Sequence, residues 1–184
     1  CDRDMGRFLI ALSERLGVFT KEFRLDASLC GLFAFGVFPV SDEKIVSTME
    51  ALKEKLWCRA GVGGIARYEG DRYQSVVPSN SEIPGNPWII CTLWYAQYLI
   101  AKAVSRDELR ESFVFLSWVA ERALRSGVLA EQVNPFSGEP VSVSPLTWSH
   151  ATFIITVQSY RSKLEETEKC PACGLSPVFR ATAG

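Results

Sequence analysis

The stretch that decides the fold is GNPWIICTLWYAQYLIAKAVSRDELRESFVFLSWVAERALRSG, residues 85–127. Its apolar side chains recur at the three- and four-residue spacing of amphipathic helices. Asn86 can cap a first helix, Pro87 suits its first helical position, and the pattern runs on to Val104. A second helix is expected from Ser105 to Gly127, because its first turn carries a capping residue and two acidic residues. The two helices must therefore form a hairpin with a very short connection. The side chains expected to face inward on the second helix are Phe113, Leu116, Val119, Ala120 and Leu124.

Helical periodicity also dominates the rest of the chain. Strong helices are expected from Ser41, as a capping residue, to Trp57, and from Leu146 to Leu164. Weaker helical segments are expected at Met5 to Leu16 and at Ala27 to Phe38. No stretch shows the sustained two-residue alternation of a half-buried strand. The sequence therefore predicts an all-α protein.

Two long, polar, Gly-rich connections, 59–84 and 126–145, separate these helices. They alternate with the tight connection at Ser105. Structureless loops of this length are uncommon in compact domains unless they carry function. Short turns at one end and long loops at the other indicate an α/α barrel, with its site at the long-loop end.

The composition narrows the classes of partner. The chain of 184 residues is 47% hydrophobic and carries a formal charge of -1, which suits one globular unit with a neutral ligand or none. Nucleic acid and acidic membrane surfaces are unlikely partners, because both favour a basic face. The apolar run 89–101 is too short for the roughly 20 residues that cross a bilayer. Because the chain starts at Cys1 without a Met or a secretory signal, the numbering is expected to begin inside a longer parent sequence.

The six cysteines favour a reducing, cytoplasmic location. Four of them are widely spaced, mostly among apolar neighbours, as free buried thiols are: Cys1, Cys30, Cys58 and Cys91. Cys170 and Cys173 have metal-ligand spacing, but two thiolates do not complete a zinc site and the sole histidine, His150, lies elsewhere. This pair is either part of a plain tail or half of a shared metal or redox site. No metal or other cofactor is expected.

Three loop segments hold groups that suit a sugar. Residues 67–71, Arg-Tyr-Glu-Gly-Asp, can grip several hydroxyls, or can form a solvated turn with a surface ion pair. Glu131 follows a helix end, where an ionised carboxylate could project into a cavity as a general base. Trp148 could stack on a sugar face or be a core residue, and His150 is either a site residue or a satisfied interior histidine.

In combination these segments resemble glycoside hydrolase family 15, the glucoamylases, glucodextranases and bacterial or archaeal trehalases. The matching segments occur in family order: Leu25-Asp26-Ala27-Ser28, Arg67-Tyr68-Glu69-Gly70-Asp71, Gly85-Asn86-Pro87-Trp88, Leu129-Ala130-Glu131-Gln132 and Pro145-Leu146-Thr147-Trp148-Ser149-His150-Ala151. The third and fifth are the most specific. The resemblance runs from about Leu25 to Arg161.

The resemblance implies an (α/α)6 barrel of which residues 1–165 supply about the C-terminal half, followed by a Cys-containing tail at 166–184. It implies an exo-acting, inverting hydrolase that releases glucose from α-glucans, oligosaccharides or trehalose, with Glu131 as the general base. The implied sugar-binding residues are Arg67, Asp71, Trp88 and Trp148, with Tyr68 and Glu69 as further lining residues.

One part of the family pattern has no match. The family's general acid precedes the base in a segment with Trp-Glu and basic neighbours, and Asp4, Glu14 and Glu22 lie in ordinary amphipathic contexts. The expected partner is therefore the missing N-terminal half of the barrel, from the same parent chain, and the 184 residues alone should be nearly inactive. The alternative is a non-catalytic, truncated helical module that binds a saccharide or a protein.

Overall fold

The computed structural model describes residue 2, residues 5–15 and residues 18–168, and this part of the chain is mostly helical. The helices are a 3-10 helix, η1 (Ala27–Cys30), and α1 (Gly31–Ala34), α2 (Glu43–Leu56), α3 (Ile89–Lys102), α4 (Arg106–Ala120) and α5 (Thr147–Glu168). Two antiparallel pairs of strands accompany them: β1 (Ala11–Arg15) with β2 (Val18–Glu22), and β3 (Gln132–Val133) with β4 (Pro140–Val141). No helix among these residues is long and apolar enough to cross a membrane.

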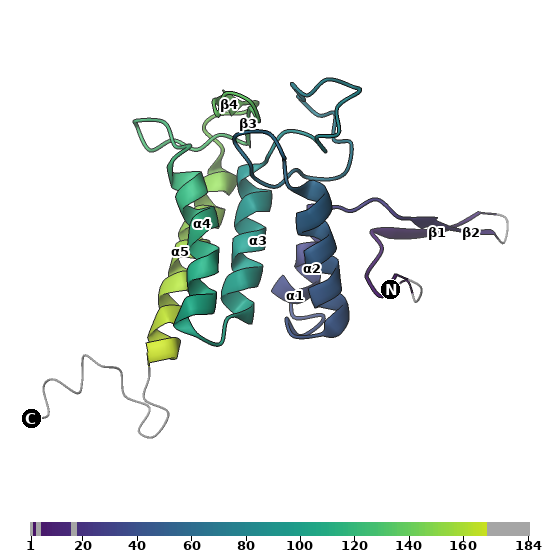
Figure 1. The fold of residues 1–184 in the computed structure, drawn as a ribbon, viewed down its shortest axis with the longest axis horizontal. Helices are drawn as coiled ribbons and strands as arrows, with labels where there is room; N and C mark the ends of the chain where they lie inside the picture. The colour runs from purple at the N-terminus through teal and green to yellow at the C-terminus, as the bar shows by residue number, and fades with distance from the viewer. Residues whose placement is uncertain (1, 3–4, 16–17, 169–184) are drawn as a thin grey trace, which may run out of the picture.

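The centre of the fold is α3, which has nine buried residues out of fourteen. One of its sides packs with α2 and η1 around Met49, Leu52 and Tyr98. The other side packs with α4 and α5, around Leu93 and Val119. Figure 1 shows α3, α4 and α5 side by side, with the short α3–α4 connection at one end and the long connections at the opposite end, where β3 and β4 lie. The predicted separation of short and long connections is confirmed.

The sequence predicts where α2 and α3 lie along the chain, but not the residues at which they begin. The N-cap of α2 is Asp42, whose carboxylate accepts from the backbone N–H of Lys44 at 2.8 Å, and not Ser41. Helix α3 begins at Ile89, so the predicted cap at Asn86 and the predicted first helical position at Pro87 are wrong. Pro87 pairs with Ala66 through a backbone bridge, the Asn86 side chain donates to Gln132, and these tertiary contacts override the local preferences.

The second helix of the hairpin starts as predicted and ends early. The hydroxyl of Ser105 caps α4 by accepting from the N–H of Glu108 at 3.2 Å. The helix stops at Ala120, well before Gly127. Of the expected inward side chains, Leu116 and Val119 are buried, whereas Phe113, Ala120 and Leu124 are exposed.

The helix predicted at Met5 to Leu16 is wrong, because no helix begins there and β1 occupies the second half of its described part. Strand β1 pairs with β2 in register from Ala11↔Glu22 to Arg15↔Val18, and Figure 1 shows this hairpin extending away from the helices. Exposed side chains occupy consecutive positions, as at Ala11, Leu12 and Ser13. Neither face of this part is buried, so the sequence carries no alternation that would reveal a strand.

The predicted segment Ala27 to Phe38 is helical only in part, through η1 and α1. Helix α1 ends at Ala34, and Gly36 follows with a φ of 70°, in the left-handed region that favours glycine. The 41–57 and 146–164 helices are confirmed as α2 and α5, the latter running on to Glu168.

The loops at the long-loop end are joined into one extended layer, which we define as residues 57, 65–68, 87–88, 131–133 and 140–141. Single antiparallel bridges connect Trp57 to Ile65, Ala66 to Pro87 and Trp88 to Gln132, and Gln132 in turn pairs with Val141 of β4. Neighbouring extended segments lie about 4.8 Å apart. The layer therefore brings residues from the two long connections, α2–α3 and α4–α5, together at one end of the helices.

The described cysteines are Cys30, Cys58 and Cys91, and all three are free and buried, as predicted. Burial raises the pKa of the Cys58 thiol to about 12 and raises those of Cys30 and Cys91 as well. These thiols are therefore protonated and unreactive in the fold. Cys1, Cys170 and Cys173 lie outside the described residues.

Candidate active site

Arg67, Asp71 and Trp88 form a single cluster on the extended layer. The Arg67 guanidinium donates to both carboxylate oxygens of Asp71, from Nη2 to Oδ1 at 2.8 Å and from Nε to Oδ2 at 3.1 Å. The indole Nε1 of Trp88 also donates to Oδ2, at 3.1 Å, and the backbone N–H of Tyr73 donates to Oδ1, at 2.9 Å. Asp71 thus accepts four hydrogen bonds while its side chain is only 1% exposed.

These bonds leave Arg67 as the charged group of the cluster that reaches solvent. Its side chain is 32% exposed, and Nη1 has no hydrogen-bond partner among the described residues. Partial burial acts to lower the pKa of Arg67, but the hydrogen bonds and charge of Asp71 outweigh it and raise the pKa. The buried carboxylate therefore fixes both the charge and the direction of the guanidinium.

Aromatic rings surround this guanidinium. The Arg67 Cζ atom lies 4.5 Å from the ring centroid of Trp88, 4.8 Å from that of Tyr68 and 5.3 Å from that of Tyr73. Tyr73 is 45% exposed, and its ring lies 6.0 Å from the Trp88 ring. The arrangement combines free polar donors with partly exposed aromatic surface, which suits a pyranose ring with polar edges and an apolar face.

Glu131 comes directly before β3, and its carboxylate is held by one oxygen. Oε2 accepts from the Ser142 hydroxyl at 2.5 Å and from Nε2 of Gln132 at 3.3 Å. Oε1 has no hydrogen-bond partner in the described part of the chain. The carboxylate is therefore oriented and still has one oxygen available for a ligand or water.

The side-chain amides of Asn86 and Gln132 form a buried chain of hydrogen bonds that ends at Glu131. Asn86 donates from Nδ2 to Oε1 of Gln132 at 2.8 Å, and Gln132 then donates to Glu131. The backbone is also tied, since the N–H of Ile89 donates to the carbonyl of Glu131 at 3.1 Å. Arg67 and Glu131 lie on extended segments that both neighbour the segment at Pro87 and Trp88, one on each side of it.

The first turn of α5 holds the backbone before Glu131. The Ser149 hydroxyl donates to the carbonyl of Ala130 at 2.7 Å, and the N–H of Leu129 donates to Nε2 of His150 at 3.0 Å. Because Nε2 of His150 accepts, it carries no proton in this arrangement. His150 is thus a half-buried histidine whose Nε2 holds the backbone before Glu131.

Two of the predicted sugar-binding residues, Glu69 and Trp148, have described contacts outside the Arg67 cluster. The Glu69 carboxylate accepts from the backbone N–H of Leu25 at 2.7 Å, so it joins two loops. Trp148 lies at the start of α5, is 54% exposed, and makes an edge contact with Trp94 at 5.7 Å between ring centroids. Its described ring contact is with α3 and not with the Arg67 cluster.

Four residues that help to form the site were not found from the sequence: Tyr73, Asn86 in its actual role, Gln132 and Ser142. Ser142 has a φ of 66°, which is unusual for a residue other than glycine. Nothing in the run Pro140 to Pro145 marks this serine, because its partner is eleven residues away. Tyr73 did have a signal, as an aromatic residue two positions after Asp71 in a loop rich in sugar-compatible groups.

Among the described residues, no group of three or more His, Cys, Asp or Glu side chains is placed to hold a metal ion. The chemistry that the site can offer rests on carboxylates, one guanidinium and aromatic rings. The fold is built on helical hairpins, and comparisons with known proteins identify the family to which it belongs.

Residues 105–158 match the family model described as glycosyl hydrolases family 15. A curated relative, an uncharacterized glycosyl hydrolase of Methanocaldococcus jannaschii, is 34% identical over 143 residues, which cover 72% of this chain and 21% of the relative. The chain belongs to glycosyl hydrolase family 15, and it spans about a fifth of the length of this curated relative.

Solved structures show the same fold. A bacterial glucoamylase complexed with acarbose matches with a TM-score of 0.64 and 24% identity, over 85% of this chain and 23% of that protein. The family 15 glucoamylase of Hypocrea jecorina matches with a TM-score of 0.61 and 20% identity, over 95% of this chain and 37% of that protein. The helices therefore form part of an (α/α)6 barrel, as predicted.

Proposed function

We propose that the protein is an exo-acting, inverting α-glucoside hydrolase and that Glu131 is its general base. The observation that carries this proposal is the asymmetric binding of the Glu131 carboxylate: Oε2 accepts from Ser142 and Gln132, while Oε1 has no partner among the described residues. A base in this reaction must be held in place yet free to accept a proton from water. Glu131 meets both requirements.

In the proposed reaction, Oε1 of Glu131 takes a proton from a water molecule. The water oxygen then attacks the anomeric carbon on the ring face opposite the leaving oxygen, and that oxygen receives a proton from a separate carboxylic acid. The bond from the anomeric carbon to the leaving oxygen breaks, and the configuration at this carbon is inverted.

The Arg67 cluster is the proposed binding site for the terminal glucose. Arg67 offers a free Nη1 group, and Tyr73, which is 45% exposed, offers aromatic surface beside it. Trp88 is buried and supports the guanidinium, so its predicted role as a wall of the pocket stays a prediction. Asp71 already accepts four hydrogen bonds, so we assign it the task of orienting Arg67 and Trp88 instead of binding a hydroxyl itself. Trp148 as a further wall of the pocket stays a prediction.

The general acid is proposed to come from a part of the protein outside these 184 residues. Supporting this, α1 and α5 border an open groove of about 410 Å³ along α3, lined in part by Phe35, Trp94, Trp148 and Ile155. Phe35 is 86% exposed and Ile155 is 55% exposed. Apolar faces of this kind are normally covered in a complete domain, and further helices of a barrel would cover them.

The proposed substrates are α-1,4-glucans, short α-glucooligosaccharides and trehalose, which share a terminal glucose. The 184 residues alone should be nearly inactive, because loss of a positioned acid typically lowers the rate about 10²–10⁴-fold.

The test is Glu131→Gln in the full-length protein, with glucose release from maltose, maltotriose and trehalose as the assay. We expect kcat to fall about 10²–10⁴-fold, with KM and the melting temperature little changed. Glu139→Gln is the matched control, because Glu139 is an exposed carboxylate in the same loop. Unchanged glucose release in Glu131→Gln would remove this residue from the role of base. A wild-type protein that binds these sugars without cleaving any of them would support the non-catalytic module instead.

A further inference from the structure

Asn86 is a buried side chain at the point where the two long connections meet. It is 1% exposed, and both ends of its amide have partners. Its Nδ2 donates to the carbonyl of Gln74 at 2.9 Å and to Oε1 of Gln132 at 2.8 Å, and its Oδ1 accepts from the backbone N–H of Val76 at 3.1 Å. Asn86 therefore ties the loop at 74–76 to β3, the strand that directly follows Glu131.

Two backbone groups fix the direction of the Asn86 amide. A backbone N–H can only donate and a backbone carbonyl can only accept, so Val76 must face Oδ1 of Asn86 and Gln74 must face Nδ2. The Nδ2 group then offers its second hydrogen to Gln132, and only the oxygen of that amide, Oε1, can accept it. The direction of the Asn86 amide therefore determines the direction of the Gln132 amide.

The Gln132 amide in turn contacts the proposed general base. Its Nε2 donates to Oε2 of Glu131 at 3.3 Å, and the hydroxyl of Ser142 donates to the same oxygen at 2.5 Å. If the amide were reversed, Gln132 would place its own oxygen against Oε2, and two acceptors with no proton between them repel each other. A displacement of about 1 Å in an active site can lower the rate about 10²-fold. The direction of the Gln132 amide therefore decides whether it holds the base or displaces it.

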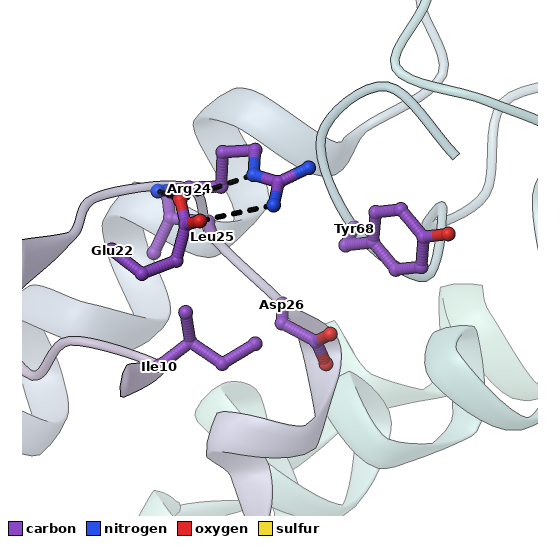
Figure 2. A pocket seen from close by; sticks show the side chains of 6 residues that line it. All are labelled: Ile10, Glu22, Arg24, Leu25, Asp26 and Tyr68. Atoms are coloured by element: carbon purple, nitrogen blue, oxygen red, sulfur yellow. Dashed lines mark hydrogen bonds and ion pairs between the residues drawn. The ribbon is translucent and has the colours of Figure 1, made fainter. Parts of the chain in front are cut away.

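The Arg67 cluster is held by contacts that do not involve Asn86. The carbonyl of Arg67 accepts from the N–H of Ala27 at 2.7 Å. A backbone bridge joins Asp26 to Tyr68, and Figure 2 shows both of these side chains lining one small pocket. A change at Asn86 should therefore disturb the base more than the binding of glucose.

We propose that Asn86 is a positioning residue for the reaction: it sets the direction of the Gln132 amide, and that amide holds the Glu131 carboxylate in place. This inference rests on the proposed function, because it takes Glu131 as the general base. It gives Asn86 a role in the reaction that acts only through Gln132, in place of the helix cap that the sequence predicted.

Asn86→Asp in the full-length protein tests this role, with initial rates of glucose release from maltotriose as the assay. The new carboxylate keeps the shape of the side chain and the oxygen that faces Val76, but it cannot donate. The Gln132 amide can bond to it only by turning its N–H₂ group towards it, which puts Oε1 against Glu131. We expect kcat to fall about 10-fold or more, while KM stays within about 3-fold of the wild-type value.

Asn86→Ala separates this effect from a loss of packing. Alanine removes the donor and leaves a cavity, but it lets the Gln132 amide keep its direction. Its kcat should therefore fall by only about 2- to 5-fold, less than that of Asn86→Asp. A role in packing alone predicts the opposite order, because alanine removes more buried atoms.

A double variant, Asn86→Asp with Gln132→Met, separates the effect from that of the new negative charge. Gln132→Met removes the amide and should itself lower kcat about 3- to 10-fold. Adding Asn86→Asp should then have little further effect, because no amide is left to reverse. An effect of charge alone would persist without Gln132 and would add to the first loss.

Asn134→Asp is the matched control, because Asn134 is a half-buried asparagine in the same connection as Glu131. Its Oδ1 accepts from the N–H groups of Phe136 and Ser137 at 2.9 and 3.2 Å. Aspartate keeps both of these bonds, so kcat and KM should not change.

Three results would overturn the positioning role and leave the proposed function standing. They are a kcat for Asn86→Asp within about 2-fold of wild type, an equal or larger loss in Asn86→Ala, and the same loss from Asn86→Asp with and without the Gln132 amide. If Asn86→Asp does not fold, Gln132→Met decides, and an unchanged kcat in that variant overturns the inference. A wild-type protein that cleaves no sugar, or a fully active Glu131→Gln, removes the proposed function and this inference with it.

Discussion

Asp71→Asn tests the claim that a buried carboxylate organises the sugar-binding cluster. Asp71 accepts from Arg67 twice, from the Trp88 indole and from the N–H of Tyr73. Asparagine has nearly the same shape but only one accepting oxygen. If that oxygen keeps the bonds to Arg67 Nη2 and to Tyr73, the new amide N–H₂ faces two donors, Nε of Arg67 and Nε1 of Trp88.

The loss in free energy of unfolding depends on how deeply each donor left without a partner is buried. Trp88 is 4% exposed, so its unpaired indole N–H costs about 1–3 kcal/mol. The Arg67 side chain is 32% exposed, so water compensates much of its loss, and the broken ion pair adds at most about 1 kcal/mol. The free energy of unfolding should therefore fall by roughly 1–4 kcal/mol.

The assay is urea unfolding of the full-length protein, followed by tryptophan fluorescence. With a slope of about 2–3 kcal/mol/M, a loss near the middle of this range lowers the midpoint by about 1 M. Asp107→Asn is the matched control, since Asp107 is 90% exposed and pairs with Arg110 at 3.4 Å. A midpoint for Asp71→Asn within about 0.2 M of wild type, or an equal shift in the control, would refute the reasoning.

Two further predictions concern packing and thiol chemistry. Gly64→Ala should destabilise the fold by about 2–4 kcal/mol, because φ is +92° and the new Cβ would lie 2.5 Å from Cζ2 of Trp118. Gly61→Ala, with nothing within 4 Å of its Cβ, should cost far less in the same thermal unfolding experiment, and equal losses would contradict this account. Burial raises the pKa of Cys58 to about 12, so the protonated thiol adds stability that is complete below about pH 9 and is lost as the pH rises towards 12. Mass spectrometry after iodoacetamide treatment should find Cys58 unmodified in the folded protein at pH 8, and rapid modification there would disprove its burial.

Local sequence patterns predicted the main helices and showed that the long loops lie at one end of them and the short connections at the other. The stripe of α2 and the cap of α4 depend on residues within a few positions of each other, so the sequence alone reveals them. The β1–β2 hairpin was missed because its exposed faces carry no periodic signal. The start of α3 was misplaced because pairing with remote loops, and not a local cap, holds Pro87 and Trp88 extended.

The sequence by itself indicated the main charged and aromatic groups of the candidate site, since Arg67, Asp71, Trp88 and Glu131 lie in loop segments of recognisable order. Only the tertiary structure decided what each group contacts. Asp71 accepts a hydrogen bond from the indole of Trp88, seventeen positions later, and Glu131 accepts one from the hydroxyl of Ser142, eleven positions later. Such pairs depend on how distant parts of each long connection fold back on one another, and this pairing has no local sequence signature. The sequence gives the chemical type of each side chain. Which of its hydrogen-bonding atoms have a partner depends on the fold.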